Sequence, residues 1–281
     1  MLDVASRAST TFCSEELRER VGNDAREPYR AFLSPMVAKL DLTIEWANQE
    51  LEKIHNEGHT VNSSIDMKDI YLKKADILDD LCLVHRSFNE TGNELTGNGV
   101  LINLIRNICG FGLTLVPLDV RQESTRHMEA LDAITRYLGL GSYSEWDEPT
   151  KITWLQSELA SKRPLIRPSE WKKSDFFSDT VKDTLGTFEM IAEQHEDSLN
   201  AYVISQATHA SDVLAVLLLQ IDAGVKNPLR VVPLFETLDD LNGAADTMKI
   251  LFNLPAYRGS INGKQEVMIG YSDSAKVRIY S

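Results

Sequence analysis

Strand-like and helix-like segments alternate along the second half of this chain, and this alternation constrains the fold more than any other feature. Short apolar runs predict the strands, and longer amphipathic stretches predict the helices between them. Strands are expected at Ala201–Ser205, Arg230–Phe235 and Glu266–Tyr271, and helices at Ser211–Ala223 and Leu238–Phe252. An earlier apolar run, Leu113–Val120, is too short for a helix and predicts a further buried strand. Such alternation implies parallel strands joined by right-handed crossovers.

Two architectures fit this alternation, a dinucleotide-binding Rossmann sheet and a (β/α) barrel. A Rossmann sheet carries the motif Gly-x-Gly-x-x-Gly directly after a strand. No such motif follows a predicted strand here, since Gly139-Leu140-Gly141 ends a predicted helix instead of opening one. We therefore predict part of a TIM-type (β/α) barrel with about four parallel strands.

The first hundred residues differ from this pattern and are predicted to be helical. Apolar side chains recur there at positions i, i+3 and i+4, the period of a helix with one buried face. Helices are predicted over 28–58, 66–88 and 101–108, and later ones over 130–138, 152–160 and 175–193, with a loop at 162–173. The predicted fold class is thus α/β and predominantly helical, with a helical region at 1–110 and the partial barrel at 111–281.

Composition argues against two classes of partner. The net charge of -13 argues against a nucleic-acid surface, because such a surface needs a basic face. No apolar run approaches the roughly 18 residues that a membrane span requires.

Cys13, Cys82 and Cys109 are widely spaced and show no metal-binding pattern, so buried, reduced thiols in a cytoplasmic protein are expected.

Polar residues follow the predicted strands at their carboxyl ends, where a (β/α) barrel carries its chemistry. They are Arg121 after the first strand, Gln206 after the second, Glu236 after the third, and Asp273 with Lys276 after the fourth. Glu236 and Asp273 follow successive strands, so both could hold one hard cation such as Mg²⁺, which takes one or two carboxylates with water and substrate oxygens. Arg121 offers a planar fork, and Lys276 a point charge, for a phosphate or a carboxylate. This set predicts a site for a phosphorylated acid.

Each of these residues also has a simpler interpretation. An acid after a strand often caps the next helix, although Thr237 or Asp239 could cap the helix that follows Glu236. Arg121, taken alone, is more often a partner in a salt bridge. His127 lies on the first turn of a predicted helix, where a packing or hydrogen-bonding role is expected.

Eight stretches of the chain resemble phosphoenolpyruvate carboxylases and occur in that family's order. The stretches are Glu27–Arg30, Phe111–Leu113, Asp119–His127, Arg136–Gly139, Lys162–Leu165, Ser211–Val216, Pro233–Glu236 and Gly263–Lys276. The third reads Asp-Val-Arg-Gln-Glu-Ser-Thr-Arg-His, and the last contains Gly-Tyr-Ser-Asp-Ser-Ala-Lys. The resemblance extends from about Glu27 to Lys276, and the combination of strings is highly specific.

The resemblance implies a predominantly helical enzyme built on an eight-stranded barrel. Such a carbon-carbon lyase joins bicarbonate to phosphoenolpyruvate, and it forms oxaloacetate and phosphate with Mg²⁺ or Mn²⁺. The reaction fixes carbon dioxide and supplies the tricarboxylic acid cycle, and full-length members are implied to be homotetramers. The positions that match Glu236 and Asp273 bind the metal in that family, and those that match Arg121 and Lys276 lie at the substrate.

Several family segments have no counterpart in this sequence. They are the amino-terminal Thr-Ala-His-Pro-Thr and Gly-Gly-Asp-Arg-Asp-Gly-Asn-Pro segments and the later Phe-His-Gly-Arg-Gly-Gly segment, which carries a catalytic histidine. The sequence therefore predicts a central fragment of the enzyme, inactive by itself. The alternative is a catalytically inactive truncated subunit that binds full-length partners, or a pseudogene-like remnant.

Overall fold

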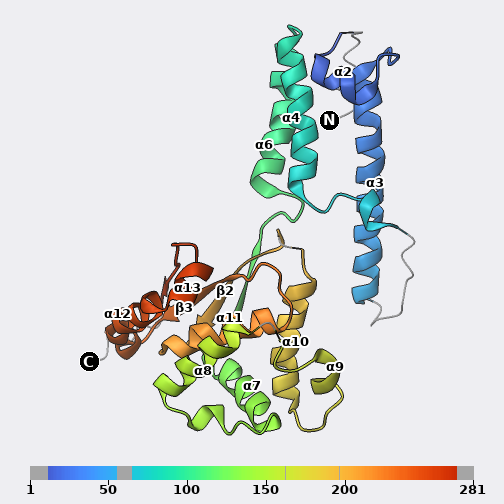
Figure 1. Ribbon diagram of the computed structural model, residues 1–281. Coiled ribbons are helices and arrows are strands. Elements are labelled where there is room, and N and C mark those ends of the chain that lie inside the picture. The colour runs from blue at the N-terminus through green and yellow to red at the C-terminus, as the bar shows by residue number, and fades with distance from the viewer. Residues whose placement is uncertain (1–11, 56–64, 162, 196, 271–281) are drawn as a thin grey trace. The chain divides into compact units, whose positions relative to one another are not determined.

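The computed structural model describes residues 12–55, 65–161, 163–195 and 197–270. The chain divides between Val116 and Pro117 into two compact units, called here the helical unit, before this bond, and the sheet unit, after it (Figure 1). Most of the described residues lie in helices, and the strands form one small parallel sheet. The predicted class, α/β and predominantly helical, is confirmed.

The helical unit consists of helices and turns in its described part. They are α2 (Glu15–Val21), α3 (Pro28–His55), η1 (Met67–Asp69), α4 (Lys74–Glu90), α5 (Glu94–Thr96), the π-helical η2 (Gly97–Leu101) and α6 (Ile102–Phe111). Its core gathers apolar side chains of α2, α3, α4 and α6, among them Leu33 and Leu81. Tyr29 stacks on Phe88 with ring centroids 4.3 Å apart. Its hydroxyl bonds to Ser87 Oγ at 2.9 Å, so this buried ring has a polar partner as well.

Four parallel strands form the sheet of the second unit in the order of the sequence. They are β1 (Leu118–Glu123), β2 (Leu199–Ser205), β3 (Arg230–Phe235) and β4 (Met268–Ile269). The register aligns Arg121 of β1 with Val203 of β2, and Val203 with Val232 of β3. Strands β2 and β3 lie inside the sheet and are buried on both faces, which explains why they are continuous apolar runs.

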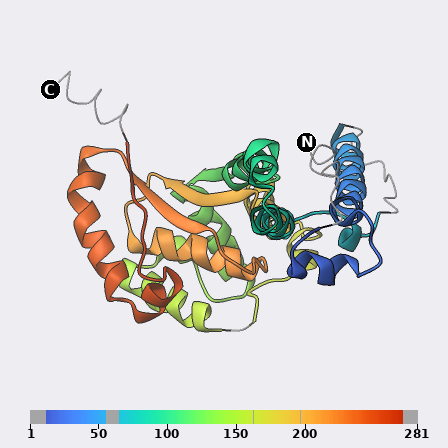
Figure 2. The same ribbon diagram turned by 90° about the horizontal axis from the view of Figure 1, so that it is seen from above.

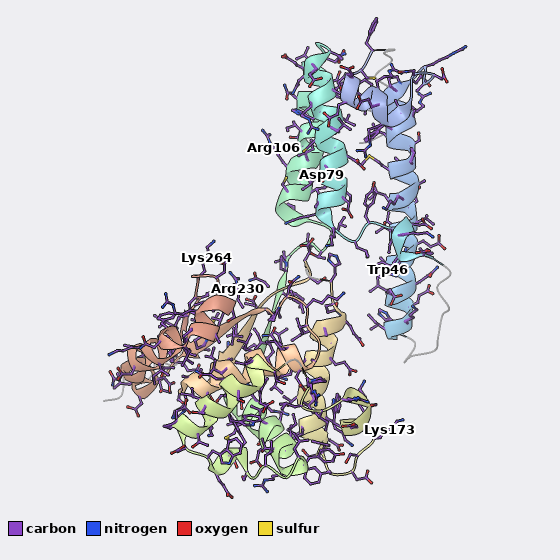
Figure 3. The ribbon with its side chains drawn as sticks, viewed as in Figure 1. Trp46, Asp79, Arg106, Lys173, Arg230 and Lys264 are labelled. Atoms are coloured by element: carbon purple, nitrogen blue, oxygen red, sulfur yellow. The ribbon has the colours of Figure 1, made fainter. Side chains whose placement is uncertain are left out.

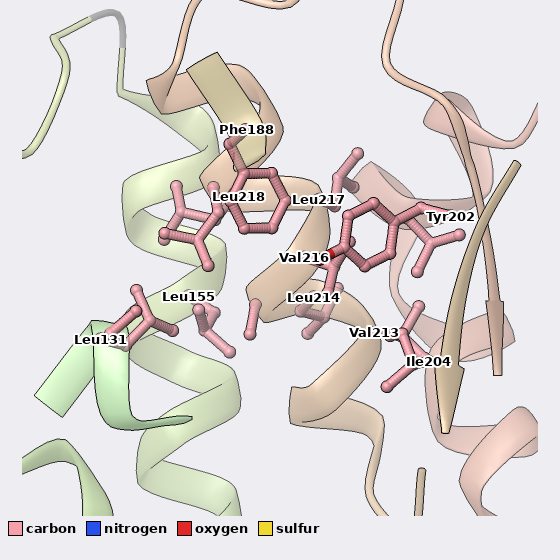
Figure 4. Close-up of a cluster of buried hydrophobic side chains, with 14 of the residues drawn as sticks. Leu131, Leu155, Phe188, Tyr202, Ile204, Val213, Leu214, Val216, Leu217 and Leu218 are labelled. Atoms are coloured by element: carbon pink, nitrogen blue, oxygen red, sulfur yellow. The ribbon is translucent and has the colours of Figure 1, made fainter. Parts of the chain in front are cut away.

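Helices of the sheet unit build its main core on one face of the sheet. They are α7 (Ser124–Tyr137), η3 (Tyr143–Glu145), α8 (Glu148–Ala160), α9 (Pro168–Trp171), α10 (Asp179–Glu193), α11 (Ala210–Asp222), α12 (Leu238–Asn253) and α13 (Pro255–Ser260). Figure 2 shows α11 lying along the sheet, and Figure 4 shows Leu214 and Leu218 of α11 among the apolar side chains of this core. Tyr202 of β2 points into the core, whereas Val203 and Val232 belong to a smaller cluster on the opposite face.

The four strands and their parallel arrangement are confirmed, and β3 has the predicted bounds, but β2 begins at Leu199 instead of Ala201 and the bounds of the first and fourth strands are wrong. The first strand begins at Leu118 and ends at Glu123, instead of spanning Leu113–Val120. The apolar residues before it lie in turns, where Leu115 has φ +67° and is 68% exposed, so hydrophobicity there does not reflect burial. The fourth strand covers Met268–Ile269 of the predicted Glu266–Tyr271, of which Tyr271 lies outside the described residues.

Two predictions of local structure and the prediction of buried cysteines differ from the structure. The second predicted helix begins at Lys74 instead of residue 66, and α9 occupies part of the predicted loop at 162–173. The cysteines are free, as predicted, but they are not buried, since Cys13 and Cys82 are half-buried and Cys109 is exposed on α6.

None of the described helices combines the length and the apolar content needed to cross a bilayer. Barrel closure stays a prediction, because β1 and β4 are the two edges of the sheet in its described part.

Candidate metal and substrate site

Two of the predicted site residues, Arg121 and Glu236, lie in the part of the parallel sheet that the structure describes. Arg121 is on β1 and exposed, and Glu236 directly follows β3 and is half-buried. Side chains alternate between the two faces of a strand. Since Val231 packs in the helix-covered core and Val232 in the opposite cluster, Glu236 belongs to the opposite face. Arg121 is aligned with Val203 and shares that face.

The register also fixes how far apart these two residues are. Arg121 is level with Val232, four residues before Glu236. At a rise of about 3.3 Å per residue the two backbone positions differ by roughly 13 Å along the strands, and two strand spacings add roughly 10 Å across them. The structure thus places the two on one face of the sheet but does not bring them into contact. A ligand of both would have to extend between them.

Gln206, which follows β2, lies beside Glu236. Its backbone N–H donates to Glu236 Oε1 across 3.4 Å, a long hydrogen bond. Gln206 has φ +55°, and Ser124 Oγ, from the start of α7, donates to its carbonyl at 2.8 Å. The ends of β1, β2 and β3 are therefore tied together around the Glu236 carboxylate.

The cap of the helix after β3 is supplied by other residues than Glu236. Thr237 Oγ1 accepts from the Asp240 N–H at 3.1 Å, and Asp240 Oδ2 accepts from the Thr237 N–H at 3.0 Å. This reciprocal pair is a capping box, and it satisfies two backbone donors at the start of α12. The interpretation of Glu236 as a helix cap is therefore wrong, and Asp240 completes the box where Asp239 was considered.

Thr237→Ala is expected to lower the free energy of unfolding by about 1 kcal/mol, because loss of a capping hydroxyl has that typical cost. Glu236→Gln is the matched comparison and should change stability by less than about 0.5 kcal/mol, as for a surface substitution away from such features. Urea denaturation followed by circular dichroism measures both. A larger loss of unfolding free energy in Glu236→Gln than in Thr237→Ala would mean that Glu236 caps the helix after all.

Arg121 makes no ion pair with any carboxylate in the described part of the chain. The simpler interpretation as a salt-bridge partner thus finds no support among these residues. Arg230, labelled in Figure 3, behaves differently at the amino end of β3, where it donates to Asn200 Oδ1 at 2.9 Å and pairs with Glu266 at 3.2 Å. Asp273 and Lys276, the other two predicted site residues, lie outside the described residues.

The donor set fits a hard cation only in part within the described residues. No group of three or more His, Cys, Asp or Glu side chains is placed to hold a metal ion there. Mg²⁺ does not need such a cage, because it keeps several waters and is usually bound through one or two carboxylates plus substrate oxygens. Glu236 offers one such carboxylate, with a single long hydrogen bond from Gln206. This arrangement is compatible with a metal ligand.

His127 has the packing and hydrogen-bonding role that the sequence predicted. It is fully buried on α7, and its Nε2 bonds to the Tyr202 hydroxyl at 2.8 Å. That hydroxyl donates to Gln122 Oε1 at 2.7 Å, so the histidine is the donor in its own bond with Tyr202. Burial lowers the pKa of His127 to about 3 and raises the pKa of Tyr202, so both side chains are neutral at physiological pH.

Two cavities are lined, in the described part of the chain, by residues other than the predicted site residues. One of about 900 Å³ borders α12, α13 and the turn before β4, and one of about 240 Å³ lies between the starts of α7 and α11. Neither is lined by Arg121 or Glu236. The candidate site is thus a surface of the sheet in its described part instead of a closed pocket.

Sequence reasoning missed one residue of this region, Gly270. It follows β4, and its N–H donates to the Phe235 carbonyl at 2.9 Å, next to Glu236. The alternation of strands indicated that β3 and β4 are neighbours, but no sequence signal gives the distance between their ends. That distance is a property of the folded sheet.

Comparisons with known proteins agree with the sequence strings. The phosphoenolpyruvate carboxylase family model matches residues 2–277. Three curated relatives bear the name phosphoenolpyruvate carboxylase. The protein of Marinomonas sp. (strain MWYL1) is 46% identical over 271 residues, 96% of this chain and 29% of the relative. That of Acinetobacter baylyi is 46% identical over 276 residues, 98% of this chain and 30% of the relative. That of Alcanivorax borkumensis is 47% identical over 264 residues, 94% of this chain and 28% of the relative.

These matches cover nearly the whole of this chain, whereas the chain spans less than a third of each relative. A family model that matches so much of the chain, with relatives at this identity, confirms the resemblance drawn from the eight strings. The chain belongs to the phosphoenolpyruvate carboxylase family.

Proposed function

We propose that this chain takes part in the carboxylation of phosphoenolpyruvate by bicarbonate, which yields oxaloacetate and phosphate. The reaction belongs to the carbon-carbon lyases and would fix carbon dioxide and supply the tricarboxylic acid cycle. Family membership supports the reaction class. The observation that carries the proposal for this chain is the Glu236 carboxylate, which stands at the end of a buried strand without serving as a helix cap.

Glu236 and Asp273 are proposed to hold Mg²⁺ or Mn²⁺. When bound, such an ion polarises substrate oxygens and neutralises their negative charge. Glu236 would supply one carboxylate oxygen, held in position by the Gln206 N–H and by the end of β3. Asp273, which follows β4 in the sequence, would supply the second carboxylate.

Arg121 and Lys276 are proposed to bind the anionic substrate. The Arg121 guanidinium is exposed on the same face as Glu236, and no described carboxylate neutralises it. Its planar fork fits a phosphate or a carboxylate through two parallel hydrogen bonds. Phosphoenolpyruvate carries both groups, so one end could contact Arg121 while the metal and Lys276 neutralise the other.

The proposal extends to the cellular setting. Three free cysteines, one of them exposed, are compatible with the reducing cytoplasm. We propose a cytoplasmic protein that works as a homotetramer, as the family resemblance implied.

The proposal is tested by exchanging segments. The stretch of the Marinomonas relative that matches this chain would be replaced by residues of this chain, and oxaloacetate formation would be followed through the oxidation of NADH by added malate dehydrogenase. Retained bicarbonate-dependent activity, within about tenfold of the unmodified relative, is expected, since the segments are 46% identical. A folded but inactive exchange protein would overturn the proposal and would favour an inactive subunit.

Arg121→Lys in the exchange protein is expected to raise the KM for phosphoenolpyruvate about tenfold, which corresponds to about 1.4 kcal/mol of binding. A lysine keeps the charge but cannot form two parallel hydrogen bonds. The metal concentration for half-maximal activity should not change. Arg230→Lys is the matched control, because Arg230, at the amino end of β3, already bonds to Asn200 and Glu266. Equal effects of the two substitutions would contradict a substrate role for Arg121.

A further inference from the structure

The backbone of β4 comes unusually close to Glu236 just after the last paired residues of the two strands. Phe235 of β3 is paired with Ile269 of β4, so the next two residues along the strands, Glu236 and Gly270, face each other. A Cβ built on Gly270 would stand 2.6 Å from Glu236 Cβ and 3.0 Å from Glu236 Cα. The Cβ position of residue 270 therefore points at Glu236, and the Glu236 side chain leaves no room there for another side chain.

Gly270 is distinguished from the other glycines of the described residues by this contact. Seven of those glycines, Gly139 among them, have a positive φ, which is sufficient reason for the residue type. Gly270 is not one of the seven. Among the glycines of the described residues, Gly270 is the one at which an added Cβ would lie 3.0 Å or less from another atom. The next shortest such distance is 3.3 Å, at Gly97. The requirement at position 270 is thus for space beside Glu236, not for a special backbone conformation.

Glu236 is consequently fixed from both sides of β3. On the β2 side, the Gln206 N–H reaches its carboxylate. On the β4 side, the Gly270 N–H bonds to the carbonyl of Phe235, the residue before Glu236, and the Gly270 backbone stands against the Glu236 Cα and Cβ. These contacts define where the carboxylate leaves the sheet.

We propose that Gly270 is a positioning residue for Glu236, which sets the location of the metal-binding carboxylate by leaving the space beside β4 that the Glu236 side chain occupies. This inference rests on the proposed function, since it takes Glu236 as a metal ligand. Gly270 itself contacts neither metal nor substrate in this scheme. It acts by the absence of a side chain against the Glu236 Cα and Cβ.

Gly270→Ala should displace Glu236 while keeping its carboxylate. Moving the new Cβ from 2.6 Å to the 3.4 Å of an ordinary contact with Glu236 Cβ requires a shift of 0.8 Å. Metal sites tolerate little displacement, because ligands must be held within about 0.5 Å of the productive geometry. Substitutions that disturb the support of a metal ligand typically cost about 10–100-fold in metal affinity. We expect the Kd for Mn²⁺ to rise by about tenfold or more.

Binding of Mn²⁺ to the full chain, followed by electron paramagnetic resonance of the free ion, tests this without any need for turnover. Four proteins are compared: the unsubstituted chain, Gly270→Ala, Glu236→Gln and Gly259→Ala. Gly259 is the matched control, because a Cβ there meets nothing within 4 Å and the residue lies on α13, before the same strand. We expect the parent chain and Gly259→Ala to have the same, lowest Kd for Mn²⁺. The Kd of Gly270→Ala should be higher, and that of Glu236→Gln should be the highest.

The outcomes separate the inference from the function on which it rests. If Glu236→Gln weakens binding but Gly270→Ala does not, the positioning role is overturned and the metal role of Glu236 stands. If Glu236→Gln binds Mn²⁺ as the parent does, or if the parent does not bind it, the metal assignment is overturned and the inference with it.

A double-mutant cycle keeps the contact testable if Gly270→Ala folds poorly. The substitution Glu236→Gly removes the Cβ that the new methyl group would meet. The melting temperature should therefore fall when Gly270→Ala is made in the parent chain, and fall much less when it is made together with Glu236→Gly. A cycle isolates such a pairwise contact from the separate effects of each substitution. Equal losses in both backgrounds would overturn the proposed contact.

Discussion

Glu236→Gln is expected to weaken the binding of Mn²⁺ by about 100-fold or more. Disturbing groups that merely support a metal ligand already costs up to about 100-fold, so removing the charge of the ligand itself should cost at least as much. A glutamine keeps the size of the side chain, and the capping box of Thr237 and Asp240 keeps α12 in place. The loss should therefore appear in metal binding and not in the melting temperature.

Glu266→Gln provides the matched carboxylate control for this experiment. Glu266 precedes β4 and pairs with Arg230 at 3.2 Å, at the amino end of β3, away from Glu236. Its removal should leave the Kd for Mn²⁺ unchanged. Equal weakening by both substitutions would mean that Mn²⁺ responds to overall charge and not to a site at the end of β3.

Phe188→Ala is expected to lower the free energy of unfolding of the sheet unit by about 3–5 kcal/mol, the usual cost of truncating a buried aromatic ring to alanine. Phe188 is 1% exposed and stacks on Tyr202, with ring centroids 5.2 Å apart and planes 5° apart (Figure 4). It also lies edge-on to His127 at 6.0 Å. A domain is typically stable by only about 5–15 kcal/mol, so this single change should remove much of the margin.

Phe176→Ala is the comparison for the core substitution. Phe176 is also a phenylalanine of the sheet unit, but it is 53% exposed and contacts the exposed Tyr137 and the buried Phe177. Its loss should cost about 1 kcal/mol or less. Denaturant unfolding of the two variants, followed by tyrosine and tryptophan fluorescence, gives the two values. Similar losses in both would contradict the assignment of the main core to the Phe188 side of the sheet.

The interior strands could be predicted because their local pattern and their tertiary environment agree. A run such as Val231–Phe235 is apolar on both faces, which is what an interior parallel strand needs, and the predicted bounds of β3 match the structure. The helix-by-strand alternation then gave the parallel order. Residues typical of helix ends also helped to predict where helices begin, as at Pro28, the first residue of α3.

The first strand was misplaced for a physical reason that no local pattern contains. Leu113, Leu115 and Val116 are as apolar as the residues of a buried strand, yet each is exposed in the described structure. Hydrophobicity predicts burial only where another element covers the segment. Which segments are covered is decided by the packing of the whole unit.

The candidate site was predicted in its residue types more fully than in its geometry. Sequence left the cap of α12 open between Glu236 and its neighbours, and only the bonds between Thr237 and Asp240 decide it. Sequence placed Arg121 at the end of a strand, whereas the register sets it four residues lower than Glu236. The close approach of Gly270 was invisible for the same reason, since the distance between two strands is not encoded in either strand alone.

The long separation in sequence between β1 and β2 has a consequence for conformational entropy. The contact between Ser124 and Gln206 closes a segment of 82 residues, whereas the contact between Gln206 and Glu236 closes one of 30. Ring closure in a flexible chain becomes less favourable with the logarithm of its length, so the first contact costs about 0.9 kcal/mol more than the second. Pairing of β1, the strand that carries Arg121, with the sheet thus has the larger entropic cost. The packing of Val120 on the helix-covered core helps to offset this cost.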